Sequence, residues 1–165
     1  MKILLLIFSF LVMVNVSSQT ALHVDIEKIE VQTKDITSSN YYTTLLNRFI
    51  DADTTLSSKQ LHFIYYGKFS QSFYRPYDPV EGQMEMYSNI EQKEFNAALI
   101  YGKRAFDLDP VDLKTLFGLS LCYHYLGNET EMNKYLWCYY SLIAVILESG
   151  NGNSIENAMV VMSVS

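Results

Sequence analysis

The fold is decided by residues 94–147, which read EFNAALIYGKRAFDLDPVDLKTLFGLSLCYHYLGNETEMNKYLWCYYSLIAVIL. Apolar and small residues recur in the first part at spacings of three and four, which predicts a helix with one buried face. This face comprises Phe95, Ala98, Leu99, Gly102, Ala105 and Phe106. Its small central residues would let another helix approach closely. Asp109-Pro110 ends the helix, because proline disfavours a helical conformation of the residue before it.

Two more helices are predicted after this proline. Residues 113–126 are apolar on almost every side, which is typical of a central, buried helix. Gly127-Asn128 forms the next turn. The last helix carries a long apolar stripe made of Met132, Tyr135, Leu136, Tyr139, Leu142, Ile143 and Ile146.

The spacing of small, apolar and turn residues in this stretch matches a known repeat. The matching residues are Ala98, Ala105 and Asp109-Pro110 in one helix, and Leu116, Leu119, Tyr123 and Gly127 in the next. The stretch therefore resembles a tetratricopeptide repeat, a helix–turn–helix unit of 34 residues that stacks on its neighbours. The chain departs from the repeat pattern at four positions. Ser120 stands where the repeat usually has Gly. One period later, Met132 and Ala144 replace the expected Ala and Pro, and one period earlier, Asn89 replaces the expected Tyr. A generic α-helical hairpin remains the alternative.

Shorter helices are predicted upstream. Asp25 would cap a short helix, although β-branched residues there also permit a strand; we favour the helix. A second helix covers residues 41–50, and a third follows Ser57 and Gln60, which match a capping box, and ends near Gly67. Residues 69–80 are aromatic and proline-containing without helical period, which predicts an ordered loop, and a short helix follows over 82–90.

Both ends of the chain differ from this helical body. Lys2 precedes a short apolar run and the small residues of Val16-Ser17-Ser18, which predicts a signal peptide over residues 1–18 and an exported, periplasmic or extracellular domain over 19–165. The run is shorter than the about 20 residues of a membrane-spanning helix. Residues 158–164 predict a β-strand. A strand without a partner is not stable, so we expect the partner strand to lie in residues missing beyond Ser165 or elsewhere in the chain.

Short motifs follow one another along most of the sequence. They are Tyr41-Tyr42 with Leu45 and Arg48-Phe49, 53–56, Tyr65-Tyr66-Gly67, Tyr74 with Pro76-Tyr77, 105–110, 149–152 and 158–165. In this order they resemble a family of exported proteins from Bacteroides-type bacteria known as a domain of unknown function. Asn151 and Asn153 stand where Asp and Lys are expected in that family. The resemblance implies export and a helical, repeat-like fold, and it implies no activity.

Composition and motifs exclude several function classes. Nucleic-acid-binding domains usually carry a positively charged surface, and the net charge of −6 does not indicate one. His23, His62 and His124 lack metal-ligand spacing, and no nucleophile elbow, phosphate loop or HExxH motif occurs. Cys122 and Cys138 are interpreted as packing residues, since a disulfide across two packed helices needs demanding geometry. We therefore expect no catalytic residue, cofactor or metal.

Aromatic residues outside the main stripes are the candidate binding residues. Tyrosine joins an apolar ring to a polar hydroxyl, which suits recognition, although the same rings would also fill a core. The candidate surface comprises Tyr65, Tyr66, Tyr74, Tyr77, Trp137 and Tyr140. The sequence thus predicts a mainly α domain that binds a protein or peptide without catalysis. The alternative is a binder of glycan or another small ligand through the Tyr-rich segment 65–77.

Overall fold

The computed structural model describes residues 24–163. Within that range the chain forms seven α-helices and one short 3-10 helix, with no β-strand. The α-helices are α1 (Ile26–Lys34), α2 (Tyr42–Ile50), α3 (Ser58–Gly67), α4 (Gln83–Glu91), α5 (Phe95–Leu108), α6 (Leu113–Tyr125) and α7 (Glu129–Glu148). The 3-10 helix η1 (Lys68–Ser70) continues α3. The predicted signal peptide, residues 1–18, lies outside the described part of the chain.

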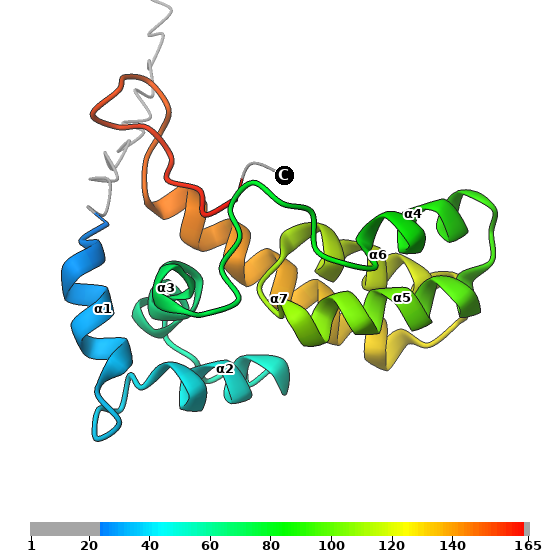
Figure 1. The fold of residues 1–165 in the computed structure, drawn as a ribbon, viewed down its shortest axis with the longest axis horizontal. Helices are drawn as coiled ribbons and strands as arrows, with labels where there is room; N and C mark the ends of the chain where they lie inside the picture. Colours follow the sequence, from blue (N-terminus) through cyan, green and yellow to red (C-terminus); the bar gives the residue numbers. More distant parts are fainter. Residues whose placement is uncertain (1–23, 164–165) are drawn as a thin grey trace, which may run out of the picture.

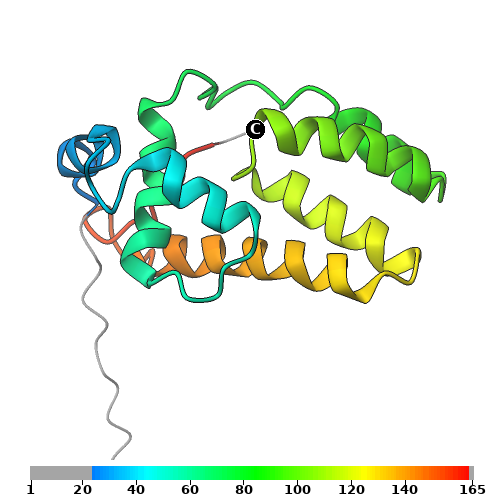
Figure 2. The same cartoon turned by 90° about the horizontal axis from the view of Figure 1, so that it is seen from below.

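The helices form two groups that share α7 (Figure 1). Helices α4 and α5 pack as one hairpin, and α6 and α7 pack as the next. Helices α1 and α2 both pack on α3, which itself packs against α7. Figure 2 shows α7 extending from the α4–α6 group to α3. No helix among residues 24–163 has the length and apolarity needed to cross a bilayer.

The helix starts confirm the capping residues expected from the sequence. The Asp25 carboxylate accepts from the Lys28 backbone N–H at 3.0 Å, so the segment with the ambiguous pattern is a helix. Ser57 and Gln60 form the reciprocal capping box that begins α3. Asp112 caps α6 by accepting from Thr115 N, and Asn128 caps α7 by accepting from Glu131 N. Each such cap contributes about 1 kcal/mol, so local sequence sets where these helices begin.

Glycines permit close approach where helices cross. A Cβ at Gly102 would lie 2.7 Å from Met86 Sδ and 2.8 Å from Leu119 Cδ2, so the predicted small-residue face of α5 does admit α4 and α6. Helix α3 ends at Gly67 as expected, but Gly67 has an ordinary right-handed helical conformation and the chain continues into η1. A Cβ at Gly67 would lie 3.0 Å from both Thr33 and Tyr42, so its small size is needed for packing with α1 and α2.

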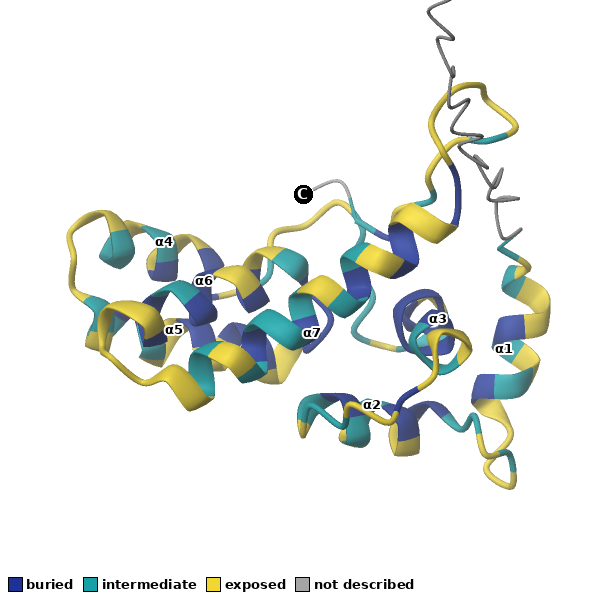
Figure 3. Ribbon diagram, turned by 180° about the vertical axis from the view of Figure 1, so that it is seen from behind, coloured by how far each residue is buried: buried dark blue, intermediate teal, exposed yellow. Residues whose placement is uncertain are grey.

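Helix α6 is central, as expected, but it is not buried on every side. Leu116, Leu119 and Cys122 are fully buried, but Phe117 is 42% exposed and Tyr125 is 60% exposed. Helix α6 packs against α4, α5 and α7, and its remaining face has no helix over it. Figure 3 shows buried and exposed segments alternating along α6 and α7.

The predicted strand at residues 158–164 is wrong for the part that is described, 158–163, which is irregular. Side chains, rather than a neighbouring strand, bond its backbone. Tyr66 Oη donates to Val160 O at 3.1 Å, Ser149 Oγ accepts from Val160 N at 2.8 Å, and Tyr65 Oη accepts from Met162 N at 3.2 Å. The apolar Met162 side chain is buried in the core. The extended tail therefore has partners inside the domain without forming a sheet.

Candidate functional site

Three aromatic rings of α6 and α7 form a chain of contacts, and a tyrosine of α4 lies near them. We call Tyr87, Phe117, Tyr139 and Tyr140 the ring cluster. The Phe117 and Tyr139 ring centroids are 5.5 Å apart, and those of Tyr139 and Tyr140 are 5.2 Å apart. Tyr87 joins α4 to α6, because its hydroxyl donates to Lys114 O at 2.9 Å. Hydrophobic rings are thus held in fixed positions at the surface.

The rings of this cluster differ in how far they are buried. Burial raises the pKa of Tyr87 to about 12, so its hydroxyl stays protonated at neutral pH and serves as a fixed donor. Phe117 is 42% exposed and Tyr140 is 62% exposed. The half-buried Tyr87 and the exposed rings of Phe117 and Tyr140 suit contact with an apolar group of a partner.

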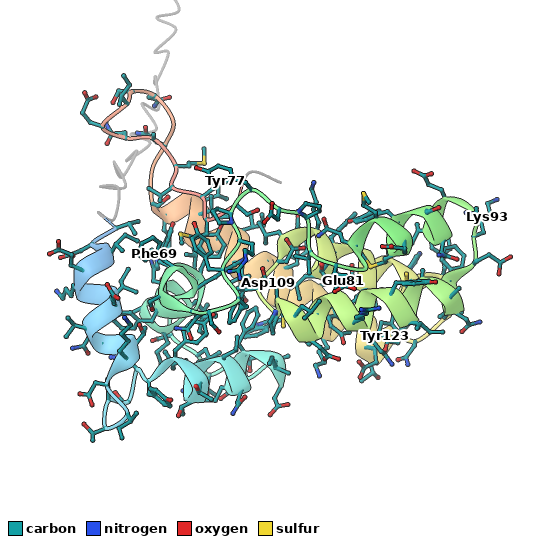
Figure 4. All side chains as sticks on the ribbon, in the orientation of Figure 1. Phe69, Tyr77, Glu81, Lys93, Asp109 and Tyr123 are labelled. Carbon is teal, nitrogen blue, oxygen red and sulfur yellow. The ribbon has the colours of Figure 1, made fainter. Side chains whose placement is uncertain are left out.

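A cavity of about 390 Å³ lies between the segment 73–81 and the C-terminal end of α5. Apolar side chains line part of it, namely Phe73, Pro79, Val80 and Leu108. The charged lining residues are Arg75, Asp78, Glu81 and Asp109. Figure 4 shows Glu81 and Asp109 below the arch of the loop and Tyr77 near its crest.

Lys68 forms an ion pair with Asp109, which lines this cavity. Their side chains are 4% and 9% exposed, so water screens the pair poorly. Burial raises the pKa of Asp109, while the Lys68 ammonium acts in the opposite direction. The Asp109 carboxylate also accepts from Val111 N at 3.3 Å. The pair links η1 to the turn between α5 and α6 and so joins the two helix groups.

The Tyr42 hydroxyl lies close to this ion pair. Among the described buried side chains, its oxygen alone lacks a hydrogen-bond partner. Burial, reinforced by the Asp109 charge, raises the pKa of Tyr42. Its ring lies against Phe73 at a centroid distance of 6.4 Å. Behind Phe73 and Asp109 of the cavity wall, the buried polar groups of Tyr42 and Lys68 are thus shielded from bulk water.

The structure does not gather the six predicted binding residues on one surface. Tyr65 and Tyr66 are buried and hold the C-terminal tail. Tyr74 is half-buried against Phe69, at a centroid distance of 5.7 Å. Tyr77 is 80% exposed at the outside of the loop. These positions weaken the alternative of a ligand site formed by tyrosines 65–77.

The two candidates on α7 also have separate surroundings. Trp137 packs on Phe49 of α2 at a centroid distance of 6.0 Å. This contact within the domain explains why Trp137 lies off the main apolar stripe of α7. Tyr140 belongs to the ring cluster. Sequence reasoning missed Phe117 and assigned Tyr139 to the core, because an all-apolar α6 gives no sign of which side stays open. The tyrosine pair 139–140 was the available signal.

The histidines and acidic turn residues have structural surroundings. His62 Nε2 lies 3.1 Å from Glu148 Oε2, whereas His124 is exposed and His23 lies outside the described residues. The Asp53 carboxylate accepts from Thr55 and Arg48, and these hydrogen bonds lower its pKa to about 2. Over residues 24–163 no three His, Cys, Asp or Glu side chains gather in a way that would hold a metal ion.

Cys122 and Cys138 are separate buried thiols, and the Cys138 thiol donates to Phe49 O at 3.3 Å. Burial raises the pKa of Cys122 to about 11 and that of Cys138 to about 12, so both remain protonated at pH 8. We therefore expect neither thiol of the native protein to react readily with Ellman's reagent at pH 8, and both to react in denaturant without reductant. Fewer than two reactive thiols in denaturant would show that the cysteines pair after all.

Comparison with known families found a match over most of the chain. The model of a family described as a domain of unknown function (DUF4919) matches residues 27–165. No curated protein and no solved structure matched the chain.

Proposed function

The chain belongs to the DUF4919 family, and on that premise we propose that it is a noncatalytic protein- or peptide-interaction module. The ring cluster on α4, α6 and α7 is the observation that carries this proposal. Exposed rings held by ring-to-ring contacts provide apolar contact area that is already ordered before binding. The partner we propose is a peptide segment with aliphatic or aromatic anchor side chains.

The repeat-like interpretation of α4–α7 supports this proposal. Helices α5 and α6 carry the sequence positions that resemble a tetratricopeptide repeat, and α4 and α7 flank them. Stacked helical hairpins present extended surfaces to partners. The ring cluster draws its members from both hairpins, so it would be formed only when they stack.

We also propose that the protein acts outside the cytoplasm of a Bacteroides-type bacterium. The support is the sequence of residues 1–18, with one basic residue, a short apolar run and small residues at the expected cleavage site. A partner would then be a periplasmic or extracellular protein. N-terminal sequencing of the protein recovered from its own host tests this, since export with cleavage predicts a chain that begins at Gln19.

A displayed library of random peptides, selected on the full chain, tests the proposed interaction. We expect selected peptides to carry clustered aromatic or aliphatic residues. Replacing Tyr140 or Phe117 with serine should weaken their binding by about tenfold or more, because anchor contacts at the centre of an interface often contribute about 2 kcal/mol. The measurement is the dissociation constant of each selected peptide by isothermal titration calorimetry.

Ile100→Ser provides the matched control. Ile100 is 71% exposed on α5 and has no place in the ring cluster, so its replacement should leave peptide binding unchanged. Two results would contradict the ring cluster as the binding surface. One is that only Ile100→Ser loses peptide binding. The other is that the selected peptides bind the Tyr140 and Phe117 variants as tightly as the parent. Unfolding curves for all three variants should remain close to that of the parent.

A further inference from the structure

The cavity beneath residues 73–81 has a composition that the peptide-binding proposal does not use. It combines an aromatic ring, Phe73, with aliphatic walls and a rim of charged side chains. Its volume of about 390 Å³ falls within the range of small-molecule sites, about 300–1,000 Å³. Size alone therefore admits a compact ligand.

The charges around the cavity largely cancel. Asp109 pairs with Lys68, and Glu81 pairs with Arg104. The other two charged lining residues, Arg75 and Asp78, have opposite signs. The lining itself carries one cation and three carboxylates, but two of these carboxylates are paired with Lys68 and Arg104, so the cavity offers little net electrostatic attraction to an anion or a cation.

Polar groups that suit hydroxyls remain at the rim. Asp78 is exposed and has no hydrogen bond or ion pair within the described residues. Arg75 uses one guanidinium nitrogen, Nη1, to donate to Ser72 O and Tyr74 O, and its other nitrogens have no partner among the described residues. A carboxylate accepts and a guanidinium donates in a planar, two-pronged geometry. Adjacent hydroxyl groups on a ring match both.

We propose that this cavity binds one neutral saccharide unit. Phe73 packs against the C–H face of the sugar ring, as aromatic side chains do with apolar surfaces. Asp78 and Arg75 bond its hydroxyls at the rim, and Leu108 closes the opposite wall. The site differs from the sequence-based alternative, because neither Tyr74 nor Tyr77 lines the cavity. The cavity shares no residue with the ring cluster, so a test of saccharide binding does not depend on the proposed function.

The test uses isotope-labelled full chain and a set of probe sugars. Glucose, galactose, mannose, xylose and N-acetylglucosamine are the neutral probes, and glucosamine and glucuronate are matched cationic and anionic probes. We expect at least one neutral sugar at millimolar concentration to shift the amide resonances of Asp78, Val80 and Leu108. Oligomers of that sugar show whether the natural ligand is a glycan chain or a free monosaccharide. An affinity that rises with oligomer length indicates a glycan chain, and a constant affinity indicates a single sugar unit.

Variants identify the residues responsible. Phe73→Ala should weaken binding about tenfold. Because Phe73 also packs on Tyr42, Asp78→Asn on the exposed rim is the second variant and should weaken binding severalfold without changing the fold. Tyr77→Ala is the control, on the same loop but outside the cavity, and should bind like the parent.

Three outcomes would overturn the proposal. One is the absence of resonance shifts with every neutral sugar. Another is tighter binding of glucosamine or glucuronate than of any neutral probe, which would assign the cavity to an ion. The third is sugar binding that persists at full strength in both Phe73→Ala and Asp78→Asn. None of these results depends on whether peptides bind the ring cluster.

Discussion

Replacing Lys68 with methionine is expected to lower the free energy of unfolding by about 3–5 kcal/mol, because it leaves the Asp109 carboxylate buried without a counter-charge. Methionine keeps most of the length of the side chain, so the loss comes from the charge rather than from a cavity. Chemical denaturation at pH 7, followed by circular dichroism, measures the change.

The pH dependence of this variant separates charge from packing. Burial already raises the pKa of Asp109, and removing Lys68 should raise it further. When the pKa of a carboxyl group is higher in the folded state than in the unfolded state, its ionised form lowers the stability of the fold as pH rises. At lower pH the group is protonated, and this loss of stability disappears. The difference in stability between variant and parent should therefore narrow below neutral pH.

Two further variants complete the comparison. Lys68→Met combined with Asp109→Asn removes both charges and should recover much of the lost stability, since a neutral buried pair avoids the isolated charge. Lys34→Ala removes an exposed pair with Glu30, whose side chains are 59% and 36% exposed, and should cost at most about 0.5 kcal/mol. A Lys68 variant no less stable than Lys34→Ala would show that the buried pair does not join the two helix groups.

Replacing Phe49 with alanine is expected to cost about 3–5 kcal/mol as well, through a cavity between α2 and α7. Phe49 is fully buried and its ring contacts Trp137. Its backbone oxygen also accepts from the Cys138 thiol, so the surrounding structure is restricted in how far it can collapse. Trp137 is the single tryptophan of the chain, and its fluorescence reports on this contact directly.

Fluorescence and stability should change together in Phe49→Ala. We expect Trp137 emission to shift to longer wavelength as water approaches the ring, and the denaturation midpoint to fall. Phe49→Leu keeps most of the volume and should cost about 1–1.5 kcal/mol. Ile36→Ala, at a position that is 76% exposed, should change stability by less than about 0.5 kcal/mol. An unchanged emission spectrum in Phe49→Ala would contradict the packing of α2 on α7.

Helix positions were predictable because their determinants are local. Ser57 with Gln60 shows the start of α3 within four residues, and Asp109-Pro110 marks the end of α5 in the same way. The family resemblance likewise followed from short motifs, and the DUF4919 match over residues 27–165 confirms an uncharacterised family.

The candidate site was harder to predict. Tyr65 and Tyr77 both look like recognition residues in sequence, yet one is 4% exposed and the other is 80% exposed.

By itself the sequence determined a mainly α-helical chain, its capped helix starts and the small-residue face of α5, since caps and periodicity depend on residues a few positions apart. Only the tertiary structure decided which side of α6 stays open, where Lys68 finds Asp109, and how residues 158–163 bond to Tyr65 and Tyr66 instead of to a strand. These contacts join residues dozens of positions apart, and no local pattern carries that information. A buried charge or an extended tail is stable only where distant side chains meet its polar groups.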